Sequence, residues 1–240
     1  MNQNILRNTF YFVLLFCILV SSNCQQEQKK LKKETTKQNV FIDDFDTDHD
    51  NYYARLHQPR FVSHGYGIYF NNAKVKLSRV AVSEADSALR IEYEIPPLYD
   101  WGNWFSIRCE LATEKSSPFS GIDSALDLKD YNGLKLNLKV EEPSNGILRI
   151  TIADVVNLGK RSDDELWWFD FKNGVLAGPT GEWQTLTLPF NKFYESYGAG
   201  TRHNDSKLNL SKIIAYEINI VSKGKTHLKG TIVLNSLVTY

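Results

Sequence analysis

From residue 40 onward, hydrophobic and polar residues alternate in short runs, with the period of two that a strand with one buried face requires. The clearest run starts at Trp183, where Leu186 and Leu188 fall on one face and Thr185 and Thr187 on the other. A Gly-Pro-Thr-Gly turn signal precedes this run, and a proline, which has no N–H for a strand ladder, closes it. We predict a strand here with partner strands on both sides, and we expect the phenylalanines after the proline to pack beneath its exit loop.

Similar runs recur along the chain, and no long helical period accompanies them. The stretch of about 200 residues that contains them is long enough to bury a substantial core as one domain. The predicted fold class is therefore all-β, a β-sandwich. The alternating runs are Ala88–Ile95, Trp104–Leu111, Leu134–Val140, Ile147–Ala153, Leu166–Phe171, Leu210–Val221 and Gly230–Tyr240.

The chain begins with the pattern of a secretory signal. Arg7 precedes the apolar run Phe10–Val20, whose eleven residues are too few to cross a bilayer as a helix. Small residues follow this run, and Cys24 after them resembles the lipidated cysteine of a bacterial lipoprotein. Asn23 stands where Gly or Ala is usual, so cleavage without lipidation stays open as an alternative. Export from the cytoplasm is predicted in either case.

The residues after Cys24 are rich in Gln, Lys, Glu and Thr, and they contain too few apolar side chains to form a core. They are predicted to be a solvated tether rather than a basic patch for anionic surfaces, because Glu27 and Glu34 dilute the lysines. The 28 basic and 28 acidic residues give zero net charge, so no nucleic-acid partner is predicted. The predicted organisation is a signal peptide over residues 1–23, a lipidated cysteine and tether over 24–39, and a β-sandwich over 40–240.

The sequence contains no recognisable catalytic motif: it has no nucleophile elbow, no zinc-binding His-Glu-x-x-His helix and no phosphate loop. A glycosidase needs two carboxylates across a cleft. The pairs Glu165 with Asp170 and Glu110 with Glu217 are conceivable, but no pattern selects either one. Cys109 lies on an apolar face without a neighbouring base and is predicted to be a small buried hydrophobic residue. The protein is predicted not to be an enzyme.

Outward-facing aromatic and charged residues form the candidate binding surface. Trp167 and the phenylalanines that share its phase are assigned to the core, so Trp168 and Asp170 point to the opposite face. A sugar ring has an apolar face and a rim of hydroxyls, which suits a flat aromatic beside charged hydrogen-bonding groups. Two alternatives stay open, namely that the tryptophans are covered and that Arg149 and Asp170 form only a cross-strand ion pair. The candidate carbohydrate-binding residues are Trp104, Arg108, Asn137, Arg149, Trp168 and Asp170.

Acidic residues crowd the start of the sandwich, and carboxylate oxygens are the ligands that calcium prefers. An EF-hand that starts at Asp44 is excluded, because His49 and Arg55 occupy positions that require Gly and Glu. A solvated strand end without any metal is the alternative. If structural calcium is a cofactor, its predicted ligands in this stretch are Asp43, Asp44 and Asp46.

A set of short motifs, most of them turns and core positions, extends over nearly all of residues 41–240. They are Asp-Asp-Phe-Asp after the first strand, Asp-Leu-x-x-Tyr-x-Gly-Leu-x-Leu at 127–136, Leu-Arg-Ile-x-Ile-x-Asp at 148–154, Gly-Glu-Trp-Gln-Thr-Leu-Thr-Leu-Pro-Phe-x-x-Phe at 181–193, Leu-Ser-Lys-Ile at 210–213 and Gly-x-Ile-x-Leu-x-x-Leu at 230–237. Together they resemble the galactose-binding-like β-sandwich, and within it most of all carbohydrate-binding module family eleven. The domain of the complex I intermediate-associated protein family is the next most similar. Such motifs are specific for a fold and weak for a ligand.

The resemblance implies a jelly roll whose concave sheet binds a β-glucan-type chain, with structural calcium near the ends of the domain. The acidic first strand matches this pattern. In the last strand Asn235 stands where relatives have Asp, so a neutral oxygen donor weakens any calcium site shared with that strand.

Two classes of function follow. The first is a non-catalytic lipoprotein of the cell envelope, at the outer membrane or cell surface, that holds a β-glucan-like polysaccharide for glycan-degrading enzymes encoded elsewhere. The second is a protein-interaction or assembly module on the same fold, which the complex I resemblance implies. The predicted export favours the first, because that assembly role belongs to an intracellular setting.

Overall fold

The computed structural model describes residue 39 and residues 41–45, 61–63, 66–70, 72–84, 86–111, 113–114, 122–157, 164–171, 174–196 and 205–240. Contacts divide the chain into two units, Met1–Asn39 and Val40–Tyr240. The predicted signal peptide, Cys24 and the tether up to residue 38 lie outside the described residues. Within the described ranges, no helix combines the length and the apolar character that crossing a membrane requires.

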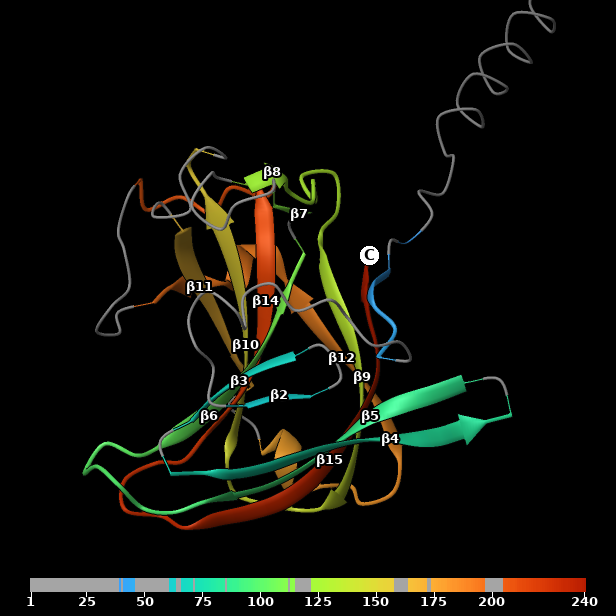
Figure 1. Cartoon of the computed structure of the whole chain (residues 1–240), viewed down its shortest axis with the longest axis vertical. Coiled ribbons are helices and arrows are strands. Elements are labelled where there is room, and N and C mark those ends of the chain that lie inside the picture. Colours follow the sequence, from blue (N-terminus) through green and yellow to red (C-terminus); the bar gives the residue numbers. More distant parts are fainter. Residues whose placement is uncertain are drawn as a thin grey trace, which may run out of the picture. The chain divides into compact units, whose positions relative to one another are not determined.

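The second unit is a sandwich of two antiparallel sheets (Figure 1). One sheet has six strands in the order β12-β9-β15-β5-β4, with β1 paired to β15. The other has seven strands in the order β13-β11-β10-β14-β6-β3-β2. Within the described residues, a two-stranded ribbon, β7-β8, and two short 3-10 helices connect these elements. This architecture confirms the all-β sandwich that the alternating sequence predicts.

The strand bounds show which sequence runs build each sheet. The six-stranded sheet contains β1 (Phe41–Asp43), β4 (Lys74–Ser83), β5 (Asp86–Ile95), β9 (Gly133–Glu142), β12 (Trp183–Pro189) and β15 (Leu228–Thr239). The seven-stranded sheet contains β2 (Phe61–Ser63), β3 (Tyr66–Phe70), β6 (Trp104–Glu110), β10 (Ile147–Val155), β11 (Asp164–Phe171), β13 (Tyr194–Glu195) and β14 (Ile213–Val221). The remaining elements are β7 (Thr113–Glu114), β8 (Ile122–Ser124), η2 (Val175–Ala177) and η3 (Phe190–Lys192).

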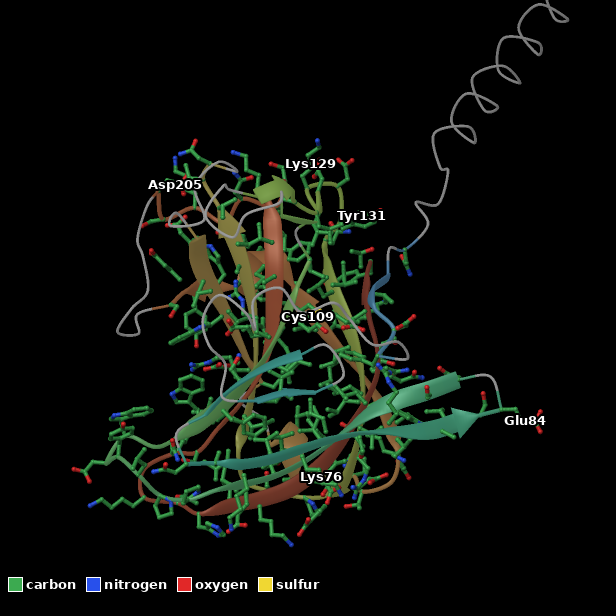
Figure 2. All side chains as sticks on the ribbon, in the orientation of Figure 1. Lys76, Glu84, Cys109, Lys129, Tyr131 and Asp205 are labelled. Atoms are coloured by element: carbon green, nitrogen blue, oxygen red, sulfur yellow. The ribbon has the colours of Figure 1, made fainter. Side chains whose placement is uncertain are left out.

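The inner faces of the two sheets share one hydrophobic core. In β9, Leu134, Leu136 and Leu138 are at most 1% exposed, whereas Lys135 between them is partly exposed. Burying each such side chain stabilises the fold by about 1.5–3 kcal/mol, so the two-residue period is strongly enforced. Cys109 on β6 is 1% exposed inside this core (Figure 2), which confirms its predicted role as a small buried hydrophobic residue.

Strand β12 forms where the sequence predicts it, but it has one partner instead of two. Among the strands that the structure describes it pairs only with β9, and it lies at the edge of the six-stranded sheet. An edge position accommodates Pro189, the last residue of the strand, because the side without a neighbour needs no N–H donor. The predicted packing of the following phenylalanines is confirmed, since Phe190 and Phe193 are 5% and 9% exposed and join the core.

A buried carboxylate connects the two sheets. Asp43 on β1 is 3% exposed, and its carboxylate accepts a hydrogen bond from the hydroxyl of Tyr216 on β14 of the opposite sheet. Its other oxygen accepts a hydrogen bond of 2.7 Å from the backbone N–H of Phe45. The Phe45 ring meets Tyr216 edge-on, with ring centroids 6.4 Å apart. The first strand is thus tied to the opposite sheet by a polar contact in addition to packing.

We expect Tyr216→Phe to lower the free energy of unfolding by about 1–3 kcal/mol, because it takes a hydrogen-bond donor from a buried carboxylate. Tyr93→Phe is the matched control, since Tyr93 is 3% exposed and its hydroxyl lies 2.7 Å from the hydroxyl oxygen of Ser144. That neutral pair predicts a smaller loss of about 0.5–1.5 kcal/mol. Urea denaturation of both variants measures the difference, and an equal or smaller loss for Tyr216→Phe would contradict the role given to Asp43.

Candidate functional site

The outer face of the seven-stranded sheet, directed away from the core, carries ordered rows of polar side chains. Because Leu148 and Ile150 of β10 are fully buried in the core, Arg149 between them points to this outer face. The strand register pairs Arg149 with Asp170 on β11 and with Asn219 on β14. Two rows follow from the register, Asp170–Arg149–Asn219–Ser106 and Trp168–Thr151–Glu217–Arg108.

Strand β11 has the phase that its sequence predicts. Trp167 is 7% exposed and belongs to the core, and Phe169 and Phe171 pack against the same core. Trp168 and Asp170 therefore lie on the opposite, outer face, where both are partly exposed. The prediction that Trp168, and not Trp167, points outward is therefore confirmed.

Arg149, Trp168, Asp170 and Tyr194 form a compact group, which we call the Trp168 cluster. Nε and Nη2 of Arg149 donate to the two carboxylate oxygens of Asp170 at 2.6 and 3.0 Å. The guanidinium carbon lies 3.8 Å from the centroid of the Trp168 ring. The hydroxyl of Tyr194 donates to Oδ2 of Asp170 at 2.8 Å, and its ring meets Trp168 edge-on at 6.2 Å. The cluster combines a flat aromatic, a planar cation and a carboxylate.

The Trp168 cluster lies between the protein interior and solvent. The side chains of Arg149 and Asp170 are 18% and 10% exposed. Burial raises the pKa of Tyr194 to about 12, and the hydrogen bond to Asp170 acts in the same direction. The hydroxyl therefore stays protonated at neutral pH and continues to donate to the carboxylate. A bidentate arginine fork stacked on an aromatic ring holds the polar edges of the cluster in a defined plane.

Arg108 lies on the predicted face but does not line its surface. It is 1% exposed, and its Nη1 donates to Oε1 of Glu217 at 2.8 Å. Ser106 donates to the other Glu217 oxygen at 3.2 Å, and Asn219 donates to the hydroxyl of Thr151 at 3.0 Å. These residues form a buried polar layer beside the Trp168 cluster, so Arg108 supports the surface rather than contacting solvent.

Trp104 and Asn137 lie apart from the Trp168 cluster. Trp104 is half-buried on the same outer face and pairs with Val221, about 14 Å across and about 13 Å along the sheet from Trp168 by standard strand spacings. Asn137 belongs to the six-stranded sheet, where it accepts a hydrogen bond of 3.2 Å from Thr185. The prediction that Asn137 shares a site with the others is wrong, because strand phase distinguishes inner from outer faces but does not assign a strand to a sheet.

The described candidates for calcium ligands do not converge. Both oxygens of Asp43 accept hydrogen bonds inside the sandwich, and Asp44 is exposed. The amide nitrogen of Asn235 donates to Asp86 at 3.3 Å. Within the part of the chain that the structure describes, no group of three or more His, Cys, Asp or Glu side chains is arranged to hold a metal ion. The oxygens of Asp43 are thus engaged inside the sandwich; Asp46 lies outside the described residues, and the calcium site stays a prediction.

Of the two carboxylate pairs considered for hydrolysis, Glu165 and Asp170 lie on opposite faces of the sheet. Glu165 shares the phase of Trp167 and is 1% exposed, whereas Asp170 points to the outer face. Glu217 is held in the ion pair with Arg108 at 2.8 Å, and the side chain of Glu110 is not among those described. Glu165, Asp170 and Glu217 each have a structural partner, and Glu165 and Asp170 do not have the geometry of a catalytic acid and base.

A buried acidic pair lies at the far end of the core. Asp154 on β10 pairs with Glu165 on β11, and each is 1% exposed. Asp154 accepts a hydrogen bond of 3.1 Å from the indole N–H of Trp167 and another from the backbone N–H of Asn209. Burial raises the pKa of Asp154 to about 6, and the charge of Glu165 acts in the same direction. This carboxyl is therefore a titrating group in the folded protein near neutral pH.

The outer face of the six-stranded sheet carries a shallow depression of 310 Å³. Its charged residues pair with one another, as Lys74 with Glu94 at 3.0 Å and Lys229 with Glu142 at 3.1 Å. Lys76, labelled in Figure 2, pairs in the same way with a neighbouring glutamate. Exposed pairs of this kind contribute little energy. The depression lacks the exposed aromatic platform and convergent polar groups that the Trp168 cluster has.

Sequence reasoning did not assign two residues of the outer face to the binding surface. Tyr194 belongs to β13, a strand of two residues that is too short to produce an alternating pattern. Glu217 could have been found, because its neighbours Tyr216 and Ile218 point into the core and the period of two sends Glu217 outward. Its pairing with Arg108 depends on the strand order, which the sequence pattern does not contain.

Solved structures share this architecture. The chain is similar to the family 11 carbohydrate-binding module of the cellulosomal cellulase Lic26A-Cel5E of Clostridium thermocellum, with a TM-score of 0.54 and 17% identity over 84% of this chain and 94% of that chain. A second structure of a family 11 module from Clostridium thermocellum is a complex with a β-1,3-1,4-mixed-linked tetrasaccharide, with a TM-score of 0.54 and 16% identity over the same shares of both chains. This likeness confirms the expected fold, a β-sandwich of the type found in family 11 carbohydrate-binding modules. No family model matches the sequence, and no curated protein matches it either.

We expect buried Asp154 to make stability fall as the pH rises from about 4 to about 6. Its folded-state pKa of about 6 exceeds the ordinary value of 3.8, so the folded state binds more protons than the unfolded state in this window. The stabilisation is complete below pH 3.8 and is lost as the pH passes 6, with a total on the order of 3 kcal/mol.

Urea unfolding from about pH 4 to about pH 7 gives the free energy of unfolding of the wild type and of Asp154→Asn. The difference between the two isolates the effect of Asp154, because the contributions of the other titrating groups cancel. The stability of the wild type relative to the variant should decrease across the window. A difference that does not change with pH would show that Asp154 titrates at its ordinary pKa.

Proposed function

We propose that the protein is a non-catalytic carbohydrate-binding protein that holds a β-glucan-like polysaccharide on the outer face of its seven-stranded sheet. The observation that carries the proposal is the Trp168 cluster, in which an indole ring, an arginine fork and a carboxylate lie together on a partly exposed surface. The fold supports the proposal, because a similar module has been solved with a mixed-linked tetrasaccharide.

The chemistry of the cluster matches that of a sugar ring. An indole offers an apolar surface for the C–H face of the sugar ring, and the guanidinium, which covers one face of the indole, fixes its orientation. Sugar hydroxyls can donate to the remaining lone pairs of Asp170 and accept from the N–H groups of Arg149 that do not face Asp170, and the planar fork keeps these groups in one plane as a lysine would not. The hydroxyl of Tyr194 holds Asp170 at 2.8 Å and so keeps the carboxylate in position.

A simple cross-strand ion pair accounts for only part of this arrangement. It explains the contacts between Arg149 and Asp170, which the register places directly opposite each other. It does not require an indole 3.8 Å beneath the guanidinium or a tyrosine hydroxyl on the same carboxylate. A largely buried ion pair adds little net stability on its own, because the loss of hydration of both charges offsets their attraction.

We expect Trp168→Ala to weaken binding of the β-1,3-1,4-mixed-linked tetrasaccharide by tenfold to a hundredfold. This corresponds to about 1–3 kcal/mol for a lost stacking partner, by analogy with bases stacked on aromatic side chains. Arg149→Lys should also weaken binding, because a lysine keeps the charge but loses the bidentate fork. Isothermal titration calorimetry measures both affinities.

Asn137→Ala is the control for this experiment, since Asn137 lies on the other sheet and should leave affinity unchanged. Thermal unfolding of each variant separates lost binding from lost folding. Unaltered affinity in a folded Trp168→Ala variant would move the site elsewhere. Failure of the wild type to bind any soluble β-glucan, xylan or mannan would favour the protein-interaction module instead.

We further propose that the protein is exported and anchored through a lipid on Cys24, which would present the bound polysaccharide at the cell surface to degrading enzymes encoded elsewhere. The signal-like leader and the position of the cysteine support this proposal. Cys24→Ser should release the protein from the membrane fraction, because one thiol carries the anchor. Cell fractionation and immunoblotting measure the release, with Cys109→Ser as the control; unchanged membrane association of Cys24→Ser would refute the anchor.

A further inference from the structure

The loop between β5 and β6 exposes an ordered pair of aromatic rings. Tyr99 and Trp101 stack with ring centroids 5.0 Å apart and planes 11° from parallel. They are 42% and 61% exposed, and Trp101 is the most exposed large hydrophobic residue in the described part of the chain. Two exposed rings that stack on each other form a contiguous apolar patch, which is typical of a binding surface.

The loop is fixed in place, so the ring pair is held before any ligand arrives. The backbone N–H of Gly102 donates to the carbonyl of Tyr99 at 3.1 Å, and that of Gly224 donates to the carbonyl of Trp101 at 3.2 Å. Gly102 has a φ of 135°, and a Cβ at this position would lie 2.1 Å from the carbonyl oxygen of Ser222. The turn therefore requires glycine, because only a residue without a side chain permits this approach.

Polar groups surround the ring pair. Asp100, between the two aromatics in sequence, forms an ion pair with Lys225 at 2.9 Å, and the two side chains are 91% and 71% exposed. A flat aromatic surface bordered by a carboxylate and a cation is the same combination that the Trp168 cluster presents. The charged residue between the rings disfavours insertion into a lipid bilayer, because a carboxylate would have to leave water with them.

The ring pair lies just beyond the end of the strand that carries Trp104. Trp104, three residues after Trp101, begins β6 on the outer face that also carries Trp168. The strand register places the β5–β6 loop beyond Trp104, at the end of the sheet (Figure 1). From Trp168 to Trp104 the sheet spans about 14 Å across and about 13 Å along the strands. A ligand that contacts both the Trp168 cluster and the loop must span more than this separation, which a long polymer can do.

We infer that Tyr99 and Trp101 form a second sugar-binding platform, separate from the Trp168 cluster, which stacks on a distant ring of the same polysaccharide chain. This inference rests on the proposed carbohydrate function and deepens it. Binding at two linked places raises the affinity for a polymer through effective concentration, without any new contact for a short ligand. The platform therefore selects for chain length.

The test compares the β-1,3-1,4-mixed-linked tetrasaccharide with polymeric mixed-linked β-glucan. Trp101→Ala should leave the affinity for the tetrasaccharide unchanged in calorimetry and should weaken retardation by the polymer in affinity electrophoresis by tenfold or more. Trp168→Ala should weaken both. Trp183→Ala is the matched control, since Trp183 is 38% exposed on the other sheet and should change neither.

Each other outcome overturns the inference. Unchanged polymer binding by Trp101→Ala, while Trp168→Ala loses it, would remove the second platform and keep the proposed function. Equal losses for both ligands in Trp101→Ala would place Trp101 in the first site. Trp101-dependent binding to phosphatidylcholine vesicles would identify a membrane contact, and failure of the wild type to bind either glycan would overturn the proposed function together with this inference.

Discussion

Burial of one face of every central strand is the constraint on which the rest of this structure depends. Leu148 and Ile150 are fully buried. Because side chains alternate along a strand, Arg149 between them must point to the outer face. The same period on β11 sends Trp168 and Asp170 to that face. A shift of either strand by one residue would bury a guanidinium and expose aliphatic side chains, so the hydrophobic core fixes the position of the polar cluster to within one residue.

On the outer face, the arginine side chains of the two ion pairs are more exposed toward the edge of the sheet than near its middle. Near the middle, Arg108 and Glu217 form an ion pair that is almost excluded from water, with side chains 2% and 13% exposed. Toward the edge, Arg149 and Asp170 form a similar pair at 18% and 10% exposure, with Tyr194 and Trp168 around it. A pair in the middle has little to offer a ligand, whereas one at the edge has polar atoms and an aromatic face within reach of solvent.

The sequence was sufficient for the fold and for the direction of individual side chains, but not for their neighbours. Alternation predicted that Trp168 and Arg149 point outward, because a two-residue period distinguishes faces without any knowledge of topology. It also placed Asn137 outward, correctly, but β9 belongs to the other sheet. Nothing in a local pattern records which strands pair, and a strand as short as β13 has no pattern at all. The contacts of Tyr194 and Glu217 therefore had to come from the structure.

If the chain is anchored at its N-terminus and holds a polymer on its sheet, the hydrogen bond between Asp43 and Tyr216 would resist mechanical force. Tension between anchor and polymer would enter the folded unit through β1, a strand of only three residues on the margin of the six-stranded sheet. Peeling such a short strand breaks few ladder hydrogen bonds. The carboxylate of Asp43 ties this strand to Tyr216 of the opposite sheet. Pulling on β1 must therefore also break a buried hydrogen bond before the sandwich can unfold.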